Sequence, residues 1–120
     1  MRIGIMYLQG DIVLIPVPFT DLSSQRRRPV IIISNQSYNQ KTKDIVVVAM
    51  TSNPVEVDYS FTITSSDLIK GQLNRPGKVR VDKIYTLSQD IIVSKFGQVN
   101  NNIINKIRNL LLDLTNGDKT

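Results

Sequence analysis

The chain offers few of the residue types that carry out acid–base or nucleophilic chemistry, because its 120 residues include no histidine and no cysteine. Without histidine it lacks the commonest general base and metal ligand, and a nucleophilic triad with an imidazole base is impossible. Without cysteine it has no disulfide, no thiol nucleophile and no thiolate zinc site. Its chemistry must come from arginine, lysine, hydroxyl and carboxylate groups, and we expect neither a metal nor a cofactor.

The basic charge is concentrated in two short segments. The formal net charge is +5 and the pI is about 9.7. Residues 26–28 are three arginines, and residues 70–83 hold five basic side chains against one aspartate. If the fold brings these segments together, they form one positive face suited to a polyanion. The alternative is that each is a solvated loop with incidental charge.

The arginine triplet ends the segment 20–28, which joins two apolar runs and stops at Pro29. Three arginines cannot be buried together unpaired, so at least two of them face solvent or an anion. Arg28 abuts the start of the next predicted strand, so its backbone is held more firmly than those of Arg26 and Arg27. Its guanidinium has forked donors that match phosphate oxygens; the alternative is an ordinary surface arginine.

A second polar feature follows the apolar run 45–50, where the chain continues Thr51-Ser52-Asn53-Pro54. Hydroxyl groups at the end of a buried strand stand at the mouth of a sheet. Thr51 or Ser52 either donates to a phosphate or caps the turn into Pro54.

Short β-rich segments must position these side chains. Apolar or alternating runs predict strands over 11–19, 30–33, 45–50, 55–63, 79–87 and 91–93. The run 45–50 suits a strand buried on both faces, whereas 55–63 alternates and has one wet face. Pro16 and Pro18 predict that the first strand ends on an edge or bends away.

One helix closes the chain, with isoleucines and leucines at helical spacing from Ile103 to Leu114 and with Asn100 or Asn101 as N-cap. A short helical turn is possible around 65–70. Many short strands and one terminal helix predict a mainly β fold, a small and strongly bent antiparallel barrel with a C-terminal α-helix. We expect one domain spanning residues 1–120.

No apolar run approaches the roughly 18 residues that span a bilayer. The first ten residues are a poor signal peptide, since they carry one charge and only a short apolar stretch. We therefore expect a cytoplasmic protein with no membrane contact.

The order of these pieces resembles the MazF/PemK family of toxin endoribonucleases from prokaryotic toxin–antitoxin pairs. The likeness covers roughly residues 10–114, and its strongest element is the strand–loop–Arg-Pro–strand unit followed by the later Thr-Ser. The segments that carry it are Gly10-Asp11-Ile12-Val13, residues 18–23, Arg26-Arg27-Arg28-Pro29-Val30, and residues 32–34, 47–52, 81–87 and 95–99.

The resemblance implies an SH3-like barrel with helical additions, usually a homodimer. It implies metal-independent, sequence-selective cleavage of single-stranded RNA, by which mRNA is cut and translation and growth are inhibited. Such cleavage needs no imidazole when the 2′-hydroxyl attacks the adjacent phosphate and leaves a 2′,3′-cyclic phosphate. The family also implies a cognate antitoxin, and the basic segments predict that its binding segment is acidic.

On the family's pattern Arg28 and Thr51 belong to the active site, Arg28 stabilising the phosphorane and Thr51 holding a phosphate oxygen. The loop serine that also holds the phosphate falls on Ser23 if one residue is deleted here, with Ser24 as a rival. The remaining residues expected to bind RNA are Arg26, Arg27, Ser24, Lys78, Arg80 and Phe19. Phe19, Tyr59 and Tyr85 are the aromatic side chains available to stack on bases.

The chain departs from the family in the loop. Well-known relatives carry a glutamate beside the serine, whereas here the neighbour is Ser24 and the loop is richer in arginine. The general base is therefore unassigned, and Asp21 is a candidate by position only. Two alternatives stay open: a nucleic-acid-binding barrel without cleavage, and an inactive family member that binds only a protein partner.

Overall fold

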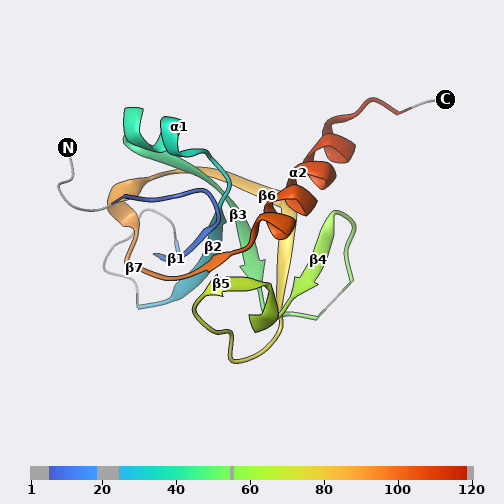
Figure 1. Cartoon of the computed structure of the whole chain (residues 1–120), viewed down its shortest axis with the longest axis horizontal. Coiled ribbons are helices and arrows are strands. Elements are labelled where there is room, and N and C mark those ends of the chain that lie inside the picture. Colours follow the sequence, from blue (N-terminus) through green and yellow to red (C-terminus); the bar gives the residue numbers. More distant parts are fainter. Residues whose placement is uncertain (1–5, 19–24, 55, 119–120) are drawn as a thin grey trace.

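The computed structural model of the chain describes residues 6–18, 25–54 and 56–118. Within these residues the chain forms seven strands, two α-helices and two single turns of 3₁₀ helix (Figure 1). In chain order they are β1 (Asp11–Pro16), β2 (Arg27–Ile32), α1 (Gln36–Lys41), β3 (Asp44–Thr51), β4 (Ser60–Ile63), η1 (Ser65–Asp67), β5 (Leu68–Lys70), β6 (Gly77–Ser88), η2 (Gln89–Ile91), β7 (Ser94–Val99) and α2 (Asn101–Thr115).

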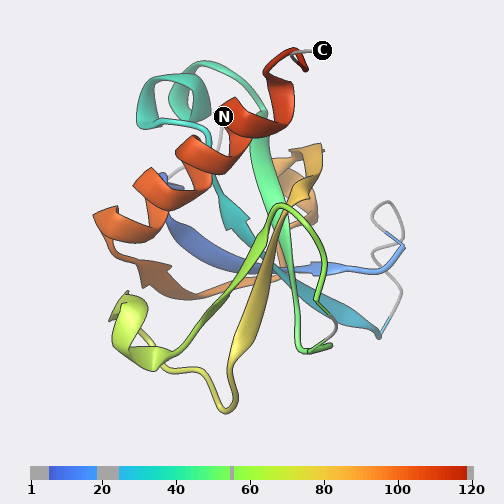
Figure 2. The same cartoon turned by 90° about the vertical axis from the view of Figure 1, so that its right-hand side faces the viewer.

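The described strands form one antiparallel sheet in the order β4-β6-β3-β2-β1-β7-β5. The sheet is strongly curled, so that it makes a half-barrel with α2 against it (Figure 2). Its longest strand, β6, pairs with β3 along one edge and with β4 along the other. The expected mainly β fold, with a bent antiparallel sheet and a C-terminal helix, is confirmed.

Successive side chains of the central strands point to opposite faces of the sheet, and both faces are covered by apolar side chains. Val47 and Val48 of β3 are both fully buried, yet they belong to two different apolar clusters. One cluster contains Val48 and lies with Ile103, Ile104 and other residues of α2; the second contains Val47 and no residue of α2. The expectation that this strand is covered on both sides is therefore confirmed.

Helix α2 begins where an asparagine caps it. The Asn100 side chain accepts a hydrogen bond from the Ile103 N–H at 3.1 Å, which satisfies one of the free donors of the first turn. Of the two caps expected, Asn100 is the one observed. Ile103, Ile104 and Ile107 are buried against the sheet, because residues three and four apart share one face of a helix.

The first strand ends at Pro16, and its end lies at an edge of the sheet, as the prolines predict. The pairing of β1 with β7 stops at Leu14, whereas its pairing with β2 continues to Pro16 and Arg27. One side of β1 therefore has no neighbouring strand at Pro16 among the described residues. Because no strand on that side would accept a backbone hydrogen bond, the lack of an N–H in proline is tolerated there. The strand is shorter than the predicted 11–19.

Several other boundaries differ from the prediction. Strand β4 begins at Ser60 rather than at 55, because Tyr59 has a φ of 59° and breaks the extended run. The predicted strand at 91–93 is wrong: Ile91 ends a 3₁₀ turn, and the strand is β7 at 94–99. The short helical turn expected near 65–70 is η1, and β5 follows it directly.

Helix α1 was not predicted, because its six residues are polar and show no apolar period. Local bonds specify it instead: the Asn35 side chain accepts from the Tyr38 N–H at 2.9 Å. Asn39 is its buried residue, and its amide donates to the carbonyls of Tyr7 at 2.9 Å and Ser34 at 3.1 Å. No helix in the described part of the chain is long and apolar enough to cross a membrane.

Candidate active site

A hollow of about 350 Å³ lies over one face of β2, β3 and β6, near the ends of these strands. Its floor is apolar and includes Val30, Ala49 and Met50. Its polar lining side chains come from the two basic segments and from the end of β3. They are Arg28, Thr51, Asn53, Lys78, Arg80, Lys83 and Tyr85.

The sheet register explains why these residues meet. Ala49 on β3 is paired with Val30 on β2 and with Arg80 on β6, and Thr51 is paired with Lys78. Arg28 lies two residues before Val30, so it projects from the same face. Arg28 of the first basic segment and three cations of the second, Lys78, Arg80 and Lys83, thus meet at one positive surface. These four residues are not on separate loops, because Arg28 lies on β2 and the other three on β6.

Arg28 presents an exposed guanidinium at this hollow. Its backbone is held by pairing with Ile15 of β1, next to Pro29. Its side chain makes no hydrogen bond or ion pair within residues 6–18, 25–54 and 56–118. Because the strand holds the Arg28 backbone and the guanidinium has no protein partner among these residues, the guanidinium is available to bind a phosphate.

Thr51 caps a turn and keeps a donor. Its Oγ1 accepts a hydrogen bond from the Asn53 N–H at 3.1 Å, so the hydroxyl does cap the turn toward Pro54. A hydroxyl that accepts one bond can still donate its hydrogen. The two interpretations of this threonine are therefore compatible, and Thr51 can cap the turn and donate to a phosphate oxygen together.

Arg80 is fixed by Asp82 on the same strand. Its Nε donates to Oδ1 at 2.9 Å and its Nη2 donates to Oδ2 at 2.8 Å. The hydrogen bonds to Asp82 raise the pKa of Arg80 above its usual value, against a smaller opposing effect of desolvation. The same bonds hold the pKa of Asp82 below its usual value, with the charge of Arg80 adding to the effect.

Lys78 is buried, with 6% of its side chain exposed, and its Nζ lies 3.6 Å from Oε1 of Glu56. Lys83 is exposed at the hollow. The hollow is therefore lined by four basic side chains and, among the described residues, by no acidic one. No cluster of three acidic side chains that could hold a metal ion is found in the part of the chain that the structure describes.

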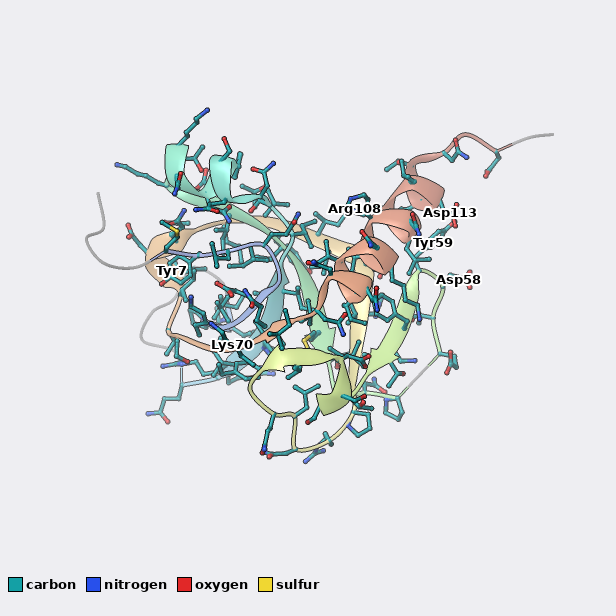
Figure 3. All side chains as sticks on the ribbon, viewed as in Figure 1. Tyr7, Asp58, Tyr59, Lys70, Arg108 and Asp113 are labelled. Atoms are coloured by element: carbon teal, nitrogen blue, oxygen red, sulfur yellow. The ribbon has the colours of Figure 1, made fainter. Side chains whose placement is uncertain are left out.

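The structure brings together four of the predicted site residues: Arg28, Thr51, Lys78 and Arg80. Arg26 and Arg27 are exposed and do not line the hollow. Of the aromatic candidates, Tyr85 lines the hollow and Tyr59, labelled in Figure 3, does not. The predictions for Phe19, Asp21, Ser23 and Ser24 fall outside the described residues.

Sequence reasoning did not single out Asn53 and Lys83 as site residues. Both stand in segments that it had marked: Asn53 in the turn after β3, and Lys83 in the basic stretch 70–83. The sequence therefore contained a reason to consider each of them: Asn53 is a polar residue in a turn beside the predicted site, and Lys83 is a basic residue beside it.

The fold and the hollow define a small β half-barrel protein with a cationic site suited to a phosphate-bearing polymer. A protein-family model described as the PemK-like, MazF-like toxin of type II toxin–antitoxin systems matches residues 8–115. The chain belongs to this family. A comparison with curated proteins gives no match.

Solved structures of endoribonucleases share the fold. An endoribonuclease in complex with its cognate antitoxin, from a mycobacterial species, has 27% identity and a TM-score of 0.70, covering 89% of this chain and 92% of that one. An endoribonuclease from a mycobacterial species has 26% identity and a TM-score of 0.72, covering 93% of each chain. A chain of MazE–MazF (form II) from Deinococcus radiodurans has a TM-score of 0.75, covering 96% of this chain and 100% of that one; at 17% identity it supports the fold alone.

Proposed function

We propose that this chain is a toxin endoribonuclease that cuts single-stranded RNA, with mRNA as the target, and so inhibits translation and growth. The observation that carries the proposal is the meeting of Arg28, Thr51, Lys78 and Arg80 in one hollow. Family membership and the likeness to endoribonucleases support it. The chain's residues suit a reaction in which RNA supplies its own nucleophile, since neither histidine nor cysteine is present.

In this reaction the 2′-oxygen forms a bond to the neighbouring phosphorus and the bond from phosphorus to the 5′-oxygen breaks. A base takes the proton of the 2′-hydroxyl, and the departing 5′-oxygen receives a proton. The products are a 2′,3′-cyclic phosphate and a 5′-hydroxyl end. The intermediate phosphorane carries two negative charges where the phosphate carried one, so preorganised donors accelerate the reaction.

Arg28 stabilises the phosphorane, and Thr51 donates a hydrogen bond to one of its oxygens. Arg80, held by Asp82, and the exposed Arg26 and Arg27 bind flanking phosphates. Lys78 also contacts the RNA backbone. Ser23, or its rival Ser24, completes the phosphate contacts, and Phe19 contacts a base. The proton acceptor is unassigned, because no acidic side chain among the described residues lines the hollow.

The proposed partners are RNA, an acidic antitoxin and a second copy of the chain. Family membership supports the antitoxin and the second copy, and one similar endoribonuclease was solved in complex with its cognate antitoxin. Light scattering of the pure protein measures whether it is a dimer, and a monomer at working concentration would remove that part of the proposal.

The decisive experiment incubates the pure protein with a long single-stranded RNA in excess EDTA. We expect discrete fragments that end in 2′,3′-cyclic phosphate and begin with a 5′-hydroxyl. The competing function, RNA binding without cleavage, would leave the RNA intact and retard it in a gel. Fragments that appear only when a divalent cation is added would contradict the proposed chemistry.

A further inference from the structure

Lys78 is an unusual lysine because strands and loop enclose it. It lies within β6, between Thr51 of β3 and Thr62 of β4, and 6% of its side chain is exposed. No other lysine among the described residues is buried. The described residues contain no buried side-chain nitrogen or oxygen without a hydrogen-bond partner, so the Lys78 nitrogen, which has none, keeps some contact with solvent while its stem is enclosed. An ammonium that has lost much of its hydration favours an anion beside it.

The protein supplies that anion only weakly. The ammonium has one ion pair among the described residues, with Oε1 of Glu56 at 3.6 Å, and no hydrogen bond. A direct charge-assisted hydrogen bond would be about 2.7–2.9 Å long. The Glu56 side chain is itself 95% exposed. A solvated carboxylate at this distance is easily displaced by a better placed anion, since exposed ion pairs contribute little.

The position of Lys78 directs it toward the reacting phosphate rather than a flanking one. Thr51 is its direct partner on the neighbouring strand, and such partners have Cβ atoms about 4.5–5.5 Å apart. Both side chains line the hollow together with Arg28. A phosphate that accepts a hydrogen bond from the Thr51 hydroxyl therefore lies within reach of the Lys78 ammonium.

We propose that Lys78 is a third catalytic residue, which binds the reacting phosphate beside Arg28 and Thr51 and displaces Glu56, its resting counter-ion, to do so. The inference rests on the proposed ribonuclease function. A cation whose side chain is largely enclosed by protein is screened less than an exposed one, so it gains more from a second negative charge on the phosphate. Exposed cations such as Arg26 and Arg27 are screened and act mainly on affinity.

The test compares Lys78→Met with Lys41→Met, which removes an exposed lysine of α1 that does not line the hollow. Two quantities are measured: the single-turnover cleavage rate at saturating RNA, and the affinity for the same RNA with 2′-deoxyribose at the cut site. We expect Lys78→Met to lower the saturated rate about 100-fold and the affinity by less than about fivefold, because the contact strengthens in the phosphorane. Lys41→Met should change neither quantity by more than about twofold.

A second pair of variants tests the displacement without touching a buried residue. Glu56→Gln removes the resting counter-ion, and Asp58→Asn removes an acidic charge two residues away, at the outer edge of the molecule in Figure 3. We expect Glu56→Gln to tighten RNA binding about two- to fivefold at low salt, and Asp58→Asn to have a smaller effect.

The outcomes separate this inference from the function on which it rests. If Lys78→Met folds and cleaves saturating RNA within about threefold of the wild-type rate, Lys78 does not touch the reacting phosphate, although the ribonuclease function stands. Equal effects of Glu56→Gln and Asp58→Asn would show that Glu56 is not the displaced group. A wild-type protein that leaves RNA intact would overturn the function and this inference together.

Discussion

Arg80 and Asp82 are joined by two hydrogen bonds, of 2.9 and 2.8 Å, between side chains that lie two residues apart on β6. Alternate residues of a strand share a face, so the pair points to the same side of the sheet as Lys78. The carboxylate takes up two donors of the guanidinium and fixes its plane at the hollow. Asp82 is therefore a positioning residue for Arg80.

This pair makes stability depend on pH in acid. Asp82 has a folded pKa below its usual 3.8, so its contribution is complete above the unfolded pKa and is lost as the pH falls through the folded pKa. We expect Asp82→Asn to lower the free energy of unfolding by about 1 kcal/mol at pH 7 and by much less near pH 2. Urea unfolding of both proteins at the two pH values measures this, and an equal deficit at both would show that the carboxylate's charge is not the cause.

Arg28→Ala and Thr51→Ala should each remove most RNA cleavage while leaving the fold intact. Arg28 is exposed and Thr51 is half-buried at a strand end, so neither truncation empties the core. Loss of one preorganised donor to a developing oxyanion lowers the rate about 10²- to 10³-fold. The measurements are single-turnover cleavage and thermal unfolding. Arg108→Ala is the matched control, since Arg108 lies exposed on α2 (Figure 3); wild-type turnover by Arg28→Ala would refute the assignment.

Periodicity was sufficient for the elements that form the core. Apolar residues repeat at the period of the secondary structure in the strands around Ile12, Ile31 and Val47 and in the helix that follows Asn100. Because these elements bury their apolar side chains, the repeat predicts them. The sequence pattern did not predict helix α1, because a side-chain hydrogen bond of Asn35 specifies this helix and it has no apolar stripe.

Four of the residues that line the hollow, Arg28, Thr51, Lys78 and Arg80, could be named from the sequence, whereas their arrangement could not. Arg28 and Thr51 stand next to strong strand signals and within a family motif. Lys78 is enclosed because β3 and β4 pair on either side of β6, and its ion pair is with Glu56, 22 positions earlier. Local sequence carries no information on such long-range contacts, so Lys78 was grouped with the exposed cations.

Gly71 should be intolerant of any side chain. Its φ is +86°, and an added Cβ would clash with the carbonyl oxygen of Phe96 and lie 2.9 Å from the Cα of Gly97. Backbone atoms in a strand cannot move aside as a flexible side chain can, so we expect Gly71→Ala to cost about 3 kcal/mol of stability. Thermal unfolding measures this. Gly117→Ala is the control, since nothing lies within 4 Å of its added Cβ; equal melting temperatures would contradict the clash.

The segment of the antitoxin that covers this chain should be acidic. Arg28 lines one hollow with Lys78, Arg80 and Lys83, and Arg26 and Arg27 are exposed beside it in the sequence. A segment that binds these cations is expected to be disordered alone and to fold on binding. Its dissociation constant should rise on the order of tenfold between low and high salt, because charge pairing contributes much of the affinity. Titrations at several salt concentrations measure this, with Lys83→Gln weakening binding more than Lys41→Gln. An antitoxin whose binding segment is basic, or which leaves the arginines free, would contradict the prediction.

RNA cleavage should show no acid limb near neutral pH. A ribonuclease that uses two histidines gives a bell-shaped profile with apparent pKa values near 6–7, and this chain has no histidine. Arginine stays protonated throughout, lysine and tyrosine ordinarily titrate near pH 10, and the lowered pKa of Asp82 keeps that carboxylate ionised. The rate should therefore rise or stay flat from pH 6 to pH 8. Single-turnover measurements at fixed ionic strength make chemistry, rather than RNA binding or release, the step observed.

A symmetric bell centred between pH 6 and 7 would contradict this prediction in one of two ways. Either a carboxylate or lysine of this chain titrates several units from its ordinary value, or a contaminating histidine ribonuclease cuts the RNA. The Arg28→Ala protein, purified in parallel, distinguishes them. Activity that persists in this variant with the same bell belongs to the contaminant, because the variant lacks the guanidinium that stabilises the phosphorane. Activity that disappears with Arg28 assigns the bell to this chain and places a shifted acid or base in the hollow.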